Sequence, residues 1–213
     1  MTLSLISANQ RVLVVCPHTD DEFGCAGTIH RFVSGGAHVT YLALSRCEES
    51  VPAGYPLDVL EGECRASTGS LGVQDVRIEG FPVRHFPAHR QEILELLVRT
   101  NREVRPSVVL LPSTWDTHQD HQTVAQEGFR AFKNSCSILG YELPQNLISF
   151  SNTLFVGLTR ENMIAKVDAL ACYKSQQFRP YSTNEFVYGL ATVRGAQCRS
   201  AYAEAFEAVR VVV

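Results

Sequence analysis

The sequence predicts an α/β fold: a Rossmann-like, doubly wound, mostly parallel sheet with helices on both faces, in a single domain over residues 1–213. Apolar strand-like runs alternate with helical segments in the first half, and such alternation implies parallel strands joined by right-handed crossovers. No Pro-, Gly- or Ser-rich linker divides the chain. Its 213 residues are enough for one large domain with a substantial core.

The first half supplies four predicted strands and three predicted helices. Residues 12–16 are a continuous apolar run, which is typical of a strand buried on both faces. A helix is expected over 24–33, where Ile29, Phe32 and Val33 share one side, and Gly35-Gly36 ends it. Further strands are expected over 38–44, 76–78 and 107–111, and further helices over 57–71 and 90–104.

The second half is less regular. A helix over 121–133 would bury Val124, Phe129 and Phe132. The remaining expected elements are a strand over 147–156, a helix over 161–173 and a short final helix over 202–209.

Two polar clusters follow the first and fourth predicted strands. They are Pro17-His18-Thr19-Asp20-Asp21-Glu22 and His118-Gln119-Asp120-His121. In the common strand order 3-2-1-4, strands one and four are neighbours, and ligands bind beyond their carboxyl ends at this switch point. We therefore expect both clusters to form one divided site.

Bulk properties exclude several classes of function. The net charge of -3 argues against a nucleic-acid-binding surface. No apolar run approaches the roughly 20 residues that span a membrane, and residues 1–10 lack the features of a signal peptide, so we expect a soluble cytoplasmic protein. The seven cysteines include no Cys-X-X-Cys pair and are interpreted as reduced thiols.

The residue types in the two clusters suit a hydrolytic zinc site. Such a site uses three imidazole or carboxylate ligands and leaves one position for water. The candidates are His18, Asp20, Asp21, His118, Asp120 and His121. Groups beyond three ligands could supply a general base, an oxyanion donor or a partner for an imidazole. Acidic residues at a helix start can also simply favour the helix dipole, but that does not explain two clusters at adjacent strand ends.

With these motifs in view, the sequence resembles the zinc-dependent N-acetylglucosaminyl deacetylase family, called LmbE-like or PIG-L. Thr19 and Gln119 replace two prolines of the family motifs. Further matching segments are 24–29, 71–73, 106–112, 173–176 and 202–206, so the similarity spans nearly the whole chain.

The resemblance implies roles for the cluster residues. It implies Zn²⁺ bound by His18, Asp21 and His121, with Asp20 as the general base. His118 would stabilise the tetrahedral intermediate or protonate the leaving amine, and Asp120 would orient it. The implied reaction is removal of the acetyl group from an N-acetylglucosamine-type amino sugar or its conjugate, with metal-bound water attacking the amide carbonyl. The resemblance is also compatible with a homo-oligomer.

The substrate-binding residues depart from the family. Many members carry an Arg about one turn before the position of Glu63, where this chain has Leu60 or Glu61. Arg46 and Arg65 are the candidates to replace it.

Three alternatives stay open on the sequence. They are a hydrolase of another amide, an Fe(II) oxygenase built on two His and one carboxylate, and a metal-binding homologue without turnover.

Overall fold

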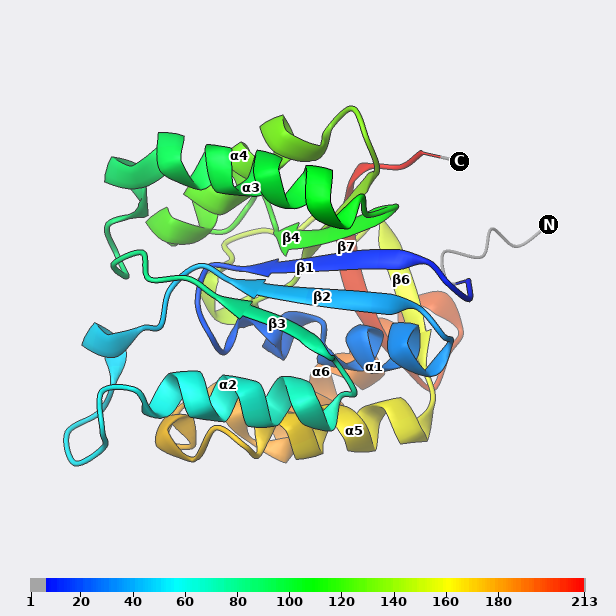
Figure 1. Cartoon of the computed structure of the whole chain (residues 1–213). Coiled ribbons are helices and arrows are strands. Elements are labelled where there is room, and N and C mark those ends of the chain that lie inside the picture. The colour runs from blue at the N-terminus through cyan, green and yellow to red at the C-terminus, as the bar shows by residue number, and fades with distance from the viewer. Residues whose placement is uncertain (1–6, 213) are drawn as a thin grey trace.

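The structure is a computed structural model that describes residues 7–212. A seven-stranded sheet runs through its centre in the order β3-β2-β1-β4-β5-β7-β6 (Figure 1). The strands are β1 (Arg11–Cys16), β2 (His38–Ala43), β3 (Asp75–Ile78), β4 (Val108–Pro112), β5 (Ser137–Tyr141), β6 (Leu154–Leu158) and β7 (Tyr202–Arg210). Strands β1 to β5 pair in parallel, whereas β7 is antiparallel to both β5 and β6.

Helices cover both faces of the sheet. They are α1 (Ala26–Ser34), α2 (Val59–Ser70), α3 (Arg90–Val104), α4 (Gln119–Phe132), α5 (Arg160–Leu170) and α6 (Asn184–Cys198). Figure 1 shows α3 and α4 on one face and α1, α2 and α5 on the other. Successive residues of β1 alternate between two apolar cores, with Val14 facing one and Val15 the other. Burial on both faces explains why this strand is apolar throughout.

The predicted fold class and the strand order 3-2-1-4 are confirmed. The helix predicted over 90–104 has the observed bounds of α3, and α4 begins two residues earlier than predicted. No helix of residues 7–212 has both the length and the apolar character needed to cross a bilayer.

The predictions for the last third of the chain are partly wrong. Residues 202–209, predicted as a helix, belong to β7, which lies between β5 and β6. Its three Ala and two Glu favour a helix intrinsically, but pairing along both edges overrides that preference. The strand expected from residue 147 begins only at Leu154. Strand β5 and helix α6 were not predicted.

Candidate metal centre and active site

The loop after β1 carries the first cluster and is held by buried hydrogen bonds. The Tyr41 and Tyr173 hydroxyls each donate to the Glu22 carboxylate, at 2.9 and 2.6 Å, and each shares its single hydrogen with the Thr19 carbonyl oxygen. Ser67 Oγ adds a third donor to Glu22 at 2.6 Å. Burial raises the pKa of Glu22 to about 7, although these three donors oppose the shift. Glu22 therefore holds the loop in place beneath the site.

Three predicted ligand atoms form a small triangle. His18 Nδ1 and Asp21 Oδ2 are 3.5 Å apart, Asp21 Oδ2 and His121 Nε2 are 3.4 Å apart, and the two imidazole nitrogens are 3.1 Å apart. Metal–ligand bonds of about 2.1 Å in a tetrahedral site place the ligand atoms roughly 3.4 Å from one another. The triangle therefore fits one metal ion bound by all three residues.

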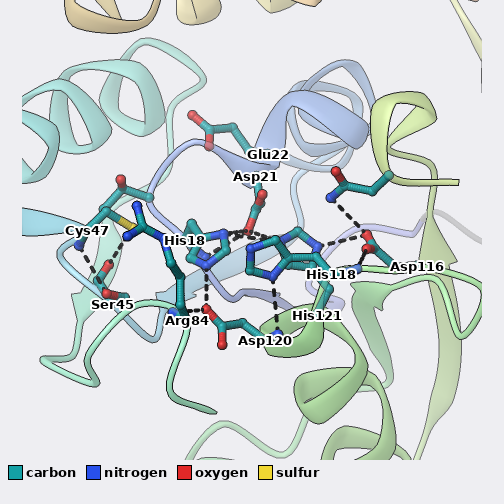
Figure 2. A network of polar contacts seen from close by, with 12 residues as sticks. His18, Asp21, Glu22, Ser45, Cys47, Arg84, Asp116, His118, Asp120 and His121 are labelled. Carbon is teal, nitrogen blue, oxygen red and sulfur yellow. Dashed lines mark hydrogen bonds and ion pairs between the residues drawn. The ribbon is translucent and has the colours of Figure 1, made fainter. Parts of the chain in front are cut away.

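The outer nitrogens of both imidazoles face carboxylates. His18 Nε2 lies 3.0 Å from Asp120 Oδ2, a contact that leaves Nδ1 free as a ligand when Nε2 carries the proton (Figure 2). His121 Nδ1 lies 2.8 Å from Asp116 Oδ2, although its N–H direction is poorly aligned for a hydrogen bond. Imidazole ligands supported in this way are typical of metal sites.

Burial raises the pKa of the Asp21 carboxyl, because little water solvates its charge, and His18 only partly opposes this. A buried carboxylate of this kind is costly unless a cation compensates it. The donor set, the distances and the burial therefore all agree with a metal ion at this point.

His118 lies at the edge of the same cluster. Its ring and those of His18 and His121 supply nitrogen atoms within 4.8 Å of one another. The His118 side chain caps α4, because its Nδ1 accepts a hydrogen bond from the Asp120 N–H at 3.2 Å. Burial, with His121 and His18 nearby, lowers the pKa of His118 to about 4. Its ring is therefore neutral near pH 7, with a proton on Nε2 available for donation.

Asp120 has a different partner from the expected one. We expected its carboxylate to orient His118, but only its backbone N–H contacts that ring. The carboxylate instead accepts from His18 and from the backbone N–H groups of Arg84 and Phe86, at 2.5 and 3.1 Å. These donors hold the pKa of Asp120 below its usual value despite the opposing effect of burial. Asp120 therefore positions a predicted metal ligand.

A cleft of about 210 Å³ opens over this cluster. Half-buried Asp20 lines it together with His18, Asp21, His118 and His121, whereas Asp120, the sixth predicted metal or catalytic residue, is buried behind them and does not line the cleft. The structure thus brings both sequence clusters to one site, as the strand order predicts.

Neither predicted substrate-binding arginine lines this cleft. Arg46 and Arg65 each lie next to Glu61, at 3.5 and 3.0 Å, and both side chains are half exposed. The cations that do line the cleft are Arg84 and Arg179, which we did not predict. Asp116 was also missed, although its position two residues before His118 is a usable signal. Leu60, one of the two residues in the place of the family's Arg, gives the cleft an apolar wall.

A model of a known protein family matches more than half of the chain. The model described as PIG-L: GlcNAc-PI de-N-acetylase matches residues 13–132. This range begins within β1, contains β2 to β4 and includes both polar clusters.

Among curated proteins, the chain is 27% identical to the uncharacterized deacetylase YaiS of Escherichia coli K12, over 80% of this chain and 95% of that protein. It is 31% identical to the diacetylchitobiose deacetylase of Thermococcus kodakarensis, over 56% of this chain. The match covers only 47% of that relative, so the chain spans about half of its length.

Solved structures share the fold. The N,N'-diacetylchitobiose deacetylase of Pyrococcus horikoshii aligns with a TM-score of 0.77 and 20% identity, over 93% of this chain and 83% of that one. The 4-carboxy-2-hydroxymuconate hydratase GalB of Pseudomonas putida KT2440 aligns with a TM-score of 0.77 and 22% identity, over 98% of both chains. The fold therefore occurs in proteins with different named activities, and the reaction has to be inferred from the site.

Proposed function

Because the chain belongs to the PIG-L family, we propose that it is a metal-dependent hydrolase that removes the acetyl group from an N-acetylated amino sugar or its conjugate. The observation that carries this proposal is the triangle of His18, Asp21 and His121 beside Asp20 and His118. The relatives named as deacetylases of diacetylchitobiose support the substrate class.

We assign zinc as the metal, since two imidazoles and one carboxylate form a common hydrolytic zinc ligand set. Zinc polarises a carbonyl and lowers the pKa of a coordinated water to about 7. His18, Asp21 and His121 would hold it.

The other residues divide the proton transfers. Asp20 takes a proton from the attacking water and returns it to the amine nitrogen as the C–N bond breaks. The Nε2–H of neutral His118 donates to the carbonyl oxygen as negative charge develops there. Asp120 keeps His18 in the tautomer that binds metal. The products are acetate and the free amino sugar.

The test is acetate release by the zinc-loaded protein on a panel of N-acetylated amino sugars. We expect Asp20→Asn to retain stoichiometric zinc but to lose activity roughly 100-fold or more, because a general base contributes about that factor. Asp168→Asn, an identical change at an exposed position of α5, is the matched control and should keep full activity. Full activity of Asp20→Asn would remove Asp20 from the base role.

Other outcomes would favour the rival functions. Iron in the purified protein together with oxygen consumption would support an oxygenase. Zinc without acetate release from amino sugars or any other amide would support a non-catalytic homologue. The cytoplasmic location, the homo-oligomer and the lack of a nucleic-acid partner stay predictions from the sequence.

A further inference from the structure

Two arginines at the cleft have no carboxylate partner. Arg84 and Arg179 line the cleft, yet neither forms an ion pair with any Asp or Glu of residues 7–212. The cations elsewhere that do form such pairs are Arg46, Arg65, Arg77, Arg90, Arg130, Lys166 and Arg194. Two unpaired guanidinium groups beside one cleft can bind a negatively charged ligand.

A chain of hydrogen bonds starting from α2 holds Arg179 in place. Ser175 Oγ donates to Glu63 at 2.6 Å and accepts from Gln176 Nε2 at 3.1 Å. Gln176 Oε1 then accepts from Arg179 Nε at 2.7 Å. Glu63, Ser175 and Gln176 are all buried, so this chain is shielded from water.

Aromatic rings add to the support of Arg179. Its guanidinium carbon lies 5.3 Å from the Phe178 ring centroid and 5.8 Å from that of Tyr181. Gln176 occupies the Nε–H, and the Tyr181 hydroxyl lies close enough to interact with the guanidinium. The two terminal nitrogens carry four N–H donors, so they can still contact two oxygens at once. An arginine that is already ordered loses less side-chain entropy when it binds an anion.

The backbone of Arg84 is tied to the metal site. It has a left-handed conformation with φ of 69°, and its N–H donates to the carboxylate of Asp120. Figure 2 shows its side chain extending from Asp120 toward Cys47, which also lines the cleft. The backbone of this second cation is therefore held next to Asp120, the residue that contacts the proposed ligand His18.

We propose that the substrate carries an anionic group, a carboxylate or a phosphate, which Arg179 binds with both terminal nitrogens and Arg84 binds from the loop beside Asp120. This inference rests on the proposed function and names its substrate as an anionic N-acetylated amino sugar. Arg84 and Arg179 thus supply the cationic contacts that Arg46 and Arg65 were expected to make.

The test compares neutral and anionic substrates by acetate release. The neutral arm is N-acetylglucosamine and N,N'-diacetylchitobiose, the phosphate arm is N-acetylglucosamine 6-phosphate, and the carboxylate arm is N-acetylmuramic acid. We expect kcat/KM to be at least about tenfold higher in one anionic arm, the factor that one charged hydrogen bond provides. The preferred arm identifies the anionic group.

Arginine variants show whether this preference comes from the proposed residues. Arg179→Gln should remove the preference by raising KM for the anionic substrate, while kcat/KM for the neutral substrates changes less than about threefold. Gln176→Met, which removes the acceptor that holds Arg179, should reduce the preference in part. Arg46→Gln makes the same chemical change outside the cleft and should keep the preference. A preference that survives in both Arg84→Gln and Arg179→Gln would overturn the inference.

Calorimetry separates this inference from the proposed function. Glucosamine 6-phosphate, glucosaminuronic acid and glucosamine are titrated into the zinc-loaded protein and into Arg179→Gln. An anionic compound that binds more tightly than glucosamine, and loses this advantage in Arg179→Gln, supports the anion site even without acetate release. In that case only the deacetylase function fails. Acetate release at equal rates from neutral and anionic substrates would keep the function and overturn the anion site.

Discussion

The Asp120 carboxylate contacts His18, 102 positions earlier in the chain, rather than His118, two positions before it. Residues two apart at a helix start point in different directions, so proximity in sequence does not make them partners. The sequence places both polar clusters at one site, but it cannot decide which carboxylate supports which imidazole. That choice depends on the loop of Arg84 and Phe86, whose N–H groups fix the Asp120 side chain.

We predict that Asp120→Asn weakens zinc binding about 10- to 100-fold, because a carboxylate that hydrogen-bonds to a metal-bound imidazole contributes about that factor to the metal affinity. The measurement is competition with a chromophoric chelator. His121→Ala, which removes a ligand, should retain no zinc, and His118→Ala should bind zinc like the wild type. Unchanged affinity in Asp120→Asn would show that the contact with His18 does not support the metal.

Arg84 and Arg179 illustrate a limit of reading the sequence. Neither stands in a periodic segment or a recognisable motif, so nothing in the sequence distinguishes them from the other arginines. Arg179 reaches the cleft because Glu63 of α2 holds Ser175 of the later loop, a contact across 112 positions.

At the scale of elements, Glu204 joins β7 to the start of α1. Its carboxylate accepts from the backbone N–H groups of Gly27 and Thr28, at 3.0 and 2.7 Å, and from Lys166 Nζ at 2.7 Å. A carboxylate at a helix N-terminus satisfies free N–H groups and favours the helix dipole. Since α1 follows the loop that carries His18 and Asp21, this contact also fixes where that loop ends.

We predict that Glu204→Ala lowers the free energy of unfolding by about 3–5 kcal/mol, because it leaves the Lys166 ammonium buried without a partner. Urea titration followed by circular dichroism measures this. Glu161→Ala, at an exposed position of α5, should change the value by less than about 0.5 kcal/mol. A loss for Glu204→Ala no larger than that of the control would contradict the role of this pair.

Elements were predictable where one local signal dominates. Strand β1 is apolar throughout and α3 has regular helical spacing, and both have nearly the predicted bounds. Strand β7 was not predictable, because its Ala and Glu residues favour a helix and only the pairing with β5 and β6 makes it a strand. Helix α6 contains Gly189 and Gly195, which weaken its local signal.

At the scale of the whole molecule, the three proposed metal ligands come from distant parts of the chain. His18 and Asp21 follow β1, whereas His121 lies in the first turn of α4, after β4. A metal ion bound by all three would join these segments in the folded state only. Its binding therefore adds to the stability of the fold.

We predict that chelation lowers the melting temperature by roughly 5–10 °C, since a ligand at 100 times its Kd contributes about 2.7 kcal/mol and each kcal/mol shifts a domain of this size by about 2–4 °C. Differential scanning calorimetry with and without EDTA measures the change, and added zinc should reverse it. His121→Ala should melt at the same temperature under both conditions. A similar EDTA effect in that variant would locate the stabilising metal elsewhere.

The position of β7 also has a consequence for the order of folding during synthesis. This strand follows all the others described in the chain, yet it lies inside the sheet, between β5 and β6. A ribosome delivers the chain from its N-terminus, so the proposed metal ligands emerge long before Glu204 can stabilise the start of α1. Until β7 emerges, the nascent chain has an unpaired edge at β5 and lacks part of the support for the loop that carries His18 and Asp21. Strands β1 to β5 can pair before this point, but only β7 completes the sheet and brings Glu204 to the start of α1.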